Sequence, residues 1–131
     1  MNPEYRNTKF LTDLNRPLPE KFGVVTSCNP NGQTVSPEEN IRLIQCLKDE
    51  LESTEEAFFP VAGCSPDQSH QEPGFGIVFS SEDRIIELGR KWQQEAIFWI
   101  EEGNVNLISC DADTREVIGQ WDQLQANSQL S

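Results

Sequence analysis

The fold is decided by one stretch, Ser36-Pro37-Glu38-Glu39-Asn40-Ile41-Arg42-Leu43-Ile44-Gln45-Cys46-Leu47. Ser36 and Glu39 form a capping box, and Pro37 stands at the first helical position, where its missing N–H costs nothing. Ile44, Leu47 and Leu51 recur at helical spacing on one face. The pattern predicts a helix over residues 37–53. Asn40 falls on the same inward face, one turn before Ile44, which is an unusual place for an amide.

Strands are expected on both sides of this helix. A β-rich run over residues 22–28 ends in the turn Asn29-Pro30-Asn31-Gly32. After the helix, residues 57–62 and 74–79 predict two strands joined by a polar loop over residues 63–73. Ser80 or Ser81 caps a second helix, expected at 81–94. Three further strands are predicted at 96–100, 105–110 and 116–121.

This element order is that of a ferredoxin-like βαββαβ unit. We therefore predict an α+β fold: a single, mostly antiparallel sheet with two helices packed on it, followed by C-terminal hairpin strands. Gly89 on the apolar stripe of the second helix predicts a close approach of that helix to the sheet. We expect residues 1–21 to form an N-terminal arm, 22–121 a single domain and 122–131 a disordered tail.

Length and charge bound the class of protein. The chain has 131 residues, the size of one domain, and 22 acids against 10 bases give a formal net charge of −12. This charge argues against direct nucleic-acid binding, because contact with phosphates depends on Lys and Arg. An acidic decoy of a nucleic-acid-binding protein stays open as an alternative to simple solubility. The longest apolar run, residues 96–100, is far below the ~20 residues of a membrane span, and we expect a cytoplasmic protein that does not contact membranes.

The metal-binding residue types are few and scattered. The four cysteines, Cys28, Cys46, Cys64 and Cys110, include no C-x-x-C pair, and His70 is the only histidine. Structural zinc sites need closely spaced ligand pairs, so we expect reduced thiols, no metal and no cofactor.

Four motifs together resemble a known family. They are Thr26-Ser27-Cys28-Asn29-Pro30, then Asn40, then Glu72-Pro73-Gly74-Phe75, then Leu88-Gly89-Arg90-Lys91-Trp92-Gln93-Gln94-Glu95-Ala96. In order and spacing they resemble an uncharacterised family of small bacterial proteins, the domain-of-unknown-function family number three-two-nine-three, over residues 22–100. Cys28 stands where that family has Trp, and Glu95 where Asn is common, which implies that a ligand could differ from that of relatives. The resemblance implies no particular activity.

Topology predicts where the polar residues of these motifs meet. In a split βαβ fold the end of the first strand, the loop between the second and third strands and the start of the fourth share one edge of the sheet. Asn29, Asn40, His70, Glu72 and Gln94 all fall at that edge. They could bind a ligand there, or they could only brace loops through hydrogen bonds to the backbone. Both interpretations stay open.

The sequence favours binding over catalysis. His70 and Glu72 could act as a base with its orienting carboxylate, and Cys28 and Cys64 are candidate nucleophiles, but no cation or second histidine stands by to activate a thiol. No Gly-rich phosphate loop and no G-x-S-x-G elbow is present. We therefore predict a binding or protein-interaction module with an unknown protein or small-molecule partner. A small enzyme using His70, Glu72 or a cysteine at the same edge is the alternative.

Overall fold

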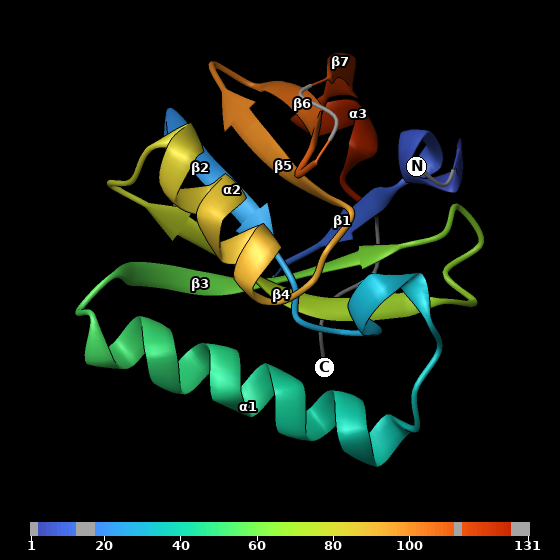
Figure 1. Cartoon of the computed structure of the whole chain (residues 1–131). Helices are drawn as coiled ribbons and strands as arrows, with labels where there is room; N and C mark the ends of the chain where they lie inside the picture. The colour runs from blue at the N-terminus through green and yellow to red at the C-terminus, as the bar shows by residue number, and fades with distance from the viewer. Residues whose placement is uncertain (1–2, 13–17, 112–113, 127–131) are drawn as a thin grey trace.

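A computed structural model describes residues 3–12, 18–111 and 114–126 of the chain (Figure 1). The elements in chain order are η1 (Pro3–Asn7), β1 (Lys9–Leu11), β2 (Lys21–Val25), η2 (Pro30–Gly32), α1 (Pro37–Ser53), β3 (Ala57–Cys64), β4 (Gln71–Val78), α2 (Glu82–Lys91), β5 (Ala96–Glu101), β6 (Asn104–Ser109), β7 (Arg115–Gln120) and α3 (Trp121–Leu124). The strands form one antiparallel sheet in the order β1-β3-β4-β2-β5-β6-β7. The predicted α+β class with a single sheet is therefore confirmed.

Helix α1 begins and ends at the predicted residues. The Ser36 hydroxyl accepts a hydrogen bond from the backbone N–H of Glu39 at 3.1 Å, so the expected cap is formed. Leu43, Leu47 and Leu51 are its buried residues. The sequence signal was sufficient here because cap, proline and apolar spacing all favoured the same helix.

Helix α2 ends three residues earlier than predicted. Gln93 adopts a left-handed conformation with φ 59°, and the backbone N–H of Gln94 reaches back to the carbonyl of Gly89 at 2.8 Å. A left-handed residue with such a bond closes the helix C-terminus. Gly89 faces the sheet as predicted: a Cβ there would lie 2.6 Å from Cys110 Sγ and 2.7 Å from Ile97 Cγ2.

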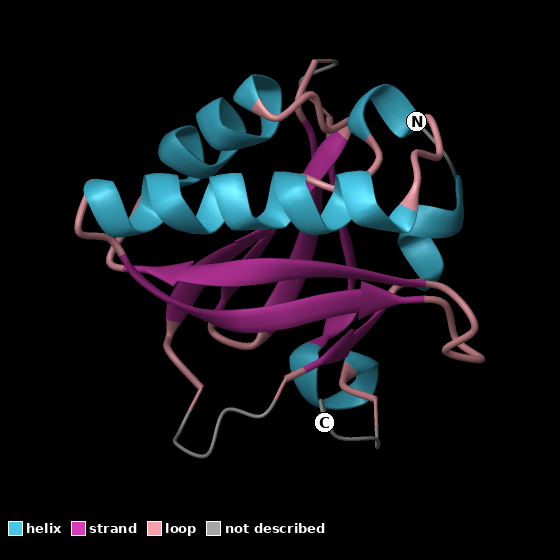
Figure 2. Ribbon diagram, turned by 90° about the horizontal axis from the view of Figure 1, so that it is seen from below, coloured by secondary structure: helices cyan, strands magenta, loops and turns pink. Residues whose placement is uncertain are grey.

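The two faces of the sheet carry separate cores. Helices α1 and α3 lie on opposite sides of strands β3 and β4 (Figure 2). The cluster that contains side chains of α1 and α2 consists of Val25, Leu47, Leu51, Phe75, Ile77, Ile85, Leu88, Ile97, Trp99, Ile108 and Cys110. The cluster that contains side chains of β1 and α3 consists of Phe10, Phe22, Val24, Phe59, Val61, Ile100, Val105, Trp121 and Leu124.

The segments at both ends of the described chain pack against the sheet, although an arm and a tail were predicted there. Within the predicted arm, β1 pairs with β3, and Phe10 is fully buried. Within the predicted tail, residues 122–124 continue α3, and the backbone N–H of Ala126 donates to the carbonyl of Phe10 at 2.7 Å. Residues 122–126 are thus part of the packed structure, while residues 127–131 of the predicted tail lie outside the described residues.

The loop between β3 and β4 is shorter than predicted. Gly63 pairs with Glu72 and Cys64 with Gln71, so both strands extend into the expected loop of residues 63–73. The remaining connection is closed by Asp67, whose carboxylate accepts from the Ser65 and Ser69 hydroxyls, each at 2.8 Å. Glu72 is consequently held on a strand, which fixes its position more firmly than a loop would.

Candidate functional site

Asn29 is placed by an unusual backbone turn at the end of β2. It adopts the left-handed conformation, with φ 48° and ψ 61°, as does Asn31 with φ 59°. Asn tolerates this region better than other side chains except Gly, which explains the amides in this turn. The backbone N–H of Asn31 then donates to the carbonyl of Gln93 at 2.8 Å, which fastens the turn to the end of α2.

Asn29 and Asn40 hold each other through two hydrogen bonds. The Asn29 backbone N–H donates to Asn40 Oδ1 at 2.9 Å, and Asn40 Nδ2 donates to Asn29 Oδ1 at 3.0 Å. The backbone N–H of Val35 also donates to Asn29 Oδ1, at 3.1 Å. The inward amide predicted on α1 therefore locks the loop that leads from β2 into this helix.

Glu72 joins the same network from β4. Asn29 Nδ2 donates to Glu72 Oε2 at 2.7 Å, a short bond of the kind that a charged acceptor makes. His70 Nε2 lies 3.8 Å from the same carboxylate oxygen, while 67% of the His70 side chain is exposed against 27% for Glu72. Three segments far apart in the sequence thus meet at Asn29, with His70 at the solvent side.

Gln94 binds the backbone next to this network. Its Nε2 donates to the carbonyls of Cys28 and Trp92, each at 3.0 Å. Gln94 therefore acts on the residue preceding Asn29, and within the described residues no hydrogen bond joins its side chain to the other four candidates. Of the five predicted residues, the structure joins Asn29, Asn40 and Glu72 directly, sets His70 beside them and places Gln94 one residue away.

A groove of about 470 Å³ opens next to the network. It lies between the first half of α1, the loop that precedes it and the start of β4. Asn29, Asn40 and His70 line it, while Glu72 and Gln94 do not. Its other lining residues are Cys28, Thr34, Val35, Pro37, Ile41, Ile44, Gln45, Gln71 and Pro73. The polar network and the groove share residues, so the same side chains both brace the loop and face an open hollow.

The apolar part of this groove was not predicted from the sequence. Ile41 is 71% exposed and Ile44 is partly buried. The signal for Ile41 was an aliphatic residue next to Asn40 but off the inward stripe of α1. Exposed single aliphatic residues are common on protein surfaces, so the pattern alone did not single it out.

The N-terminal arm contributes an unexpected neighbour. Burial and, to a smaller extent, the negative charges of Glu95 and Glu72 together raise the pKa of the Tyr5 hydroxyl to about 12. Tyr5 therefore stays protonated and lies within the electrostatic reach of the site. No motif in the sequence connects Tyr5 with Glu72.

The cysteines of the site are poor nucleophiles. Burial raises the pKa of the Cys28 thiol, and the charge of Glu72 raises it too, against a hydrogen bond with Thr26. Burial likewise raises the pKa of Cys64. Because the thiolate is the reactive form, both changes disfavour covalent catalysis. All four cysteines are free thiols.

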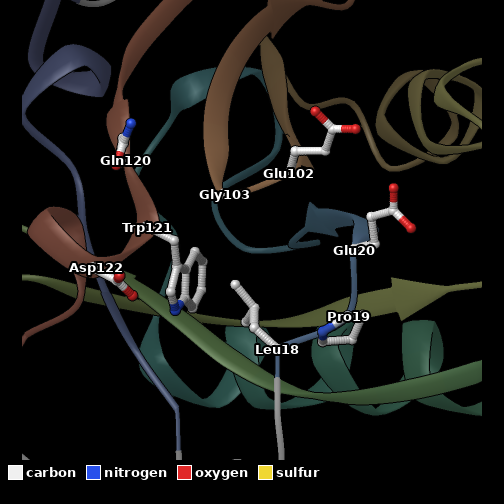
Figure 3. A pocket seen from close by; sticks show the side chains of 8 residues that line it. All are labelled: Leu18, Pro19, Glu20, Glu102, Gly103, Gln120, Trp121 and Asp122. Atoms are coloured by element: carbon white, nitrogen blue, oxygen red, sulfur yellow. The ribbon is translucent and has the colours of Figure 1, made fainter.

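A second, smaller hollow lies at the opposite end of the sheet. It measures about 280 Å³ and is lined by Leu18, Pro19, Glu20, Glu102, Gly103, Gln120, Trp121 and Asp122. Leu18 lies beside the Trp121 ring, and the carboxylates of Glu20 and Glu102 point away from that ring (Figure 3). None of the five predicted site residues lines this hollow.

The described part of the chain contains neither a cluster of metal-binding side chains nor a membrane-spanning helix. Among residues 3–12, 18–111 and 114–126 there is no group of three or more His, Cys, Asp or Glu side chains that could hold a metal ion. No helix in these ranges is long and apolar enough to span a bilayer.

Comparison with known proteins identifies the family. No curated protein and no solved structure is significantly similar to the chain. The model of the family described as "Protein of unknown function (DUF3293)" matches residues 25–97, more than half of the chain. The matched range contains all five predicted site residues, and it confirms the resemblance drawn from their motifs. The chain therefore belongs to this family of proteins of unknown function.

Proposed function

We propose that this protein is a binding module whose ligand occupies the groove beside Asn29 and Asn40. The observation that carries the proposal is a coincidence of two features. Polar residues predicted to meet at one sheet edge, Asn29, Asn40 and His70, also line the groove of about 470 Å³. Small-molecule sites typically measure roughly 300–1,000 Å³ and combine apolar walls with a few convergent polar groups.

The rigidity of the polar wall supports this function. Asn29 is bonded to Asn40, Val35 and Glu72, so its side chain cannot rotate without breaking several hydrogen bonds. A wall that is held in place before the ligand arrives loses little conformational entropy on binding. The Asn29–Asn40–Glu72 network would therefore serve the site by preorganisation.

We also infer that β2, α1, β3, β4, α2 and β5 form a ferredoxin-like unit with both helices on one face. The order β3-β4-β2-β5 within the sheet and the shared core of α1 and α2 support it. This topology accounts for the meeting of the β2 end, the β3–β4 connection and the β5 start. The four free thiols support a cytoplasmic location, since disulfides are rare there.

A small enzyme is the second candidate, and one contact favours it. His70 Nε2 lies 3.8 Å from Glu72 Oε2 at the rim of the groove, an arrangement in which a carboxylate could orient an imidazole base. An acidic decoy has less support, because Glu50 and Glu56 of the acidic α1 end turn toward Arg84 and Lys91.

A fragment screen by NMR chemical-shift mapping tests the proposal. Fragments should perturb the NMR signals of Asn29, Asn40 and Ile41. Ile41→Glu places a charge in the groove and should therefore lower the affinity of these fragments at least about tenfold, or 1.4 kcal/mol. Val117→Glu is the matched control, because Val117 is a 59% exposed aliphatic residue on β7. Fragments that bind elsewhere, or that bind Ile41→Glu unchanged, would contradict the proposal.

A further inference from the structure

The groove differs in charge from the rest of the chain. Of its described lining residues none is Asp, Glu, Lys or Arg, although 24% of the chain is charged. The carboxylate of the network, Glu72, accepts a hydrogen bond from Asn29 and does not line the groove. The lining therefore offers no counter-ion, apart from His70 at its rim, to a charged ligand.

Amides take the place of charges in this lining. Asn29, Asn40, Gln45 and Gln71 all face the groove. Each amide has two N–H donors and an oxygen that accepts two bonds. Asn40 uses one donor and one acceptor position toward Asn29, which leaves one of each. Gln71 is exposed, and within the described part of the chain no hydrogen bond of its side chain is found.

The remaining wall is aliphatic. Val35, Ile41 and Ile44 line the groove together with two prolines. Burying the exposed surface of Ile41 against an apolar ligand group would stabilise the complex, because that apolar surface leaves water. A ligand that matches both walls carries a branched aliphatic part and a group that donates and accepts hydrogen bonds together.

We propose that the ligand is an uncharged organic molecule that carries a carboxamide-like group next to a short branched aliphatic part. This inference rests on the proposed binding function and narrows its ligand class. A carboxylate ligand would lose hydration without gaining a cation and would meet the field of a chain with net charge −12. An ammonium ligand would lose hydration without gaining a carboxylate within the groove. An amide loses less on leaving water and recovers its hydrogen bonds from Asn40 and Gln71.

Three compounds with the same branched carbon skeleton test the ligand class on the full chain near neutral pH. They are isovaleramide, isovalerate and isoamylamine, each titrated into labelled protein with chemical-shift mapping. Isovaleramide should shift the NMR signals of Asn40, Ile41 and Ile44 until they saturate. Its affinity should be at least about fivefold, or 1 kcal/mol, above that of either charged analogue. Tighter groove binding by isovalerate or isoamylamine overturns the ligand class but leaves the binding function intact. If none of the three compounds shifts the signals of groove residues, the ligand class is wrong. Whether library fragments bind at the groove is a separate result, and it decides the binding function.

A charge introduced at Gln71 provides the second arm. Gln71→Glu should lower the affinity for isovaleramide and raise that for isoamylamine, so that their order reverses. Gln123→Glu on α3 is the control, since Gln123 is equally an exposed glutamine and does not line the groove. An unchanged order in Gln71→Glu would overturn the role assigned to the Gln71 amide.

Discussion

The region that the family model matches, residues 25–97, and the segments on either side of it build different parts of the molecule. The matched region holds all five candidate residues, the groove and most of the core beneath α1 and α2. The flanking segments supply most of the second core, including Phe10, Phe22 and Trp121. The candidate site and much of the packing that supports the fold therefore lie in separate stretches of sequence.

Replacing Trp121 should show the largest effect. Its ring stacks on Phe10 with centroids 4.9 Å apart and meets Phe22 edge-on at 5.3 Å, and 2% of the residue is exposed. Trp121→Ala should lower the free energy of unfolding by about 3–5 kcal/mol, measured by urea denaturation. The NMR signals of Asn29 and Ile41 in the folded fraction should stay close to those of the native chain. Gln123→Ala in the same helix is the control, and loss of the groove signals would show that the two regions are not separate.

Removing the Asn29 side chain should cost less, because it affects hydrogen bonds and not a core. Asn29→Gly keeps the left-handed backbone accessible, but it removes the acceptor of Asn40 Nδ2 and of the Val35 N–H and the amide donor to Glu72. The free energy of unfolding should fall by about 1–3 kcal/mol. Asn31→Gly is a matched control, with the same backbone conformation and one long, exposed side-chain bond of 3.4 Å to Gln93. An unchanged melting temperature for Asn29→Gly would mean that this side chain serves only a ligand.

The same two regions differ in how far the sequence predicted them. Helix α1 was predicted to the residue, because its cap and its apolar spacing are local signals. The meeting of Asn29, Asn40 and Glu72 was predicted because strand order alone brings their segments to one edge. The packing of Phe10 against Trp121 was not predicted, since Phe10 lies in a segment without a clear period and Trp121 ends a predicted strand, and neither local pattern says which distant side chain it meets. The groove was missed because its shape depends on how α1 tilts over the loop, which no residue pattern encodes.

Tyr5 links a flanking segment to the site, and its titration measures that link. Tyr5 is the only tyrosine, so ultraviolet difference absorbance reports it alone. Its folded pKa of about 12 lies above the ordinary tyrosine value of 10.0, so between these pH values the folded state keeps the proton while the unfolded state loses it. Stability should therefore be intact below pH 10 and decline as the pH rises toward 12, and Tyr5→Phe should remove this decline. Glu95→Gln should lower the pKa of Tyr5, whereas an ordinary pKa in the native chain would place the arm away from the site.

Phe79 should show the smallest effect, and it tests whether the matched region is constrained only at its polar end. Phe79 follows β4 at the end of the sheet away from Asn29, with φ 59° and 96% of the residue exposed. A left-handed conformation costs a residue with a Cβ roughly 1–2 kcal/mol, and Asn bears it better. Phe79→Asn should therefore raise the free energy of unfolding by about 0.5–1 kcal/mol, since the exposed ring contributes little packing in return. Phe79→Ala separates the two contributions: it removes the ring but keeps the backbone cost, so its stability should stay near that of the native chain. A loss of stability in both variants would show that the Phe79 ring supports the fold. The matched region would then be constrained at this turn as well as at its polar end.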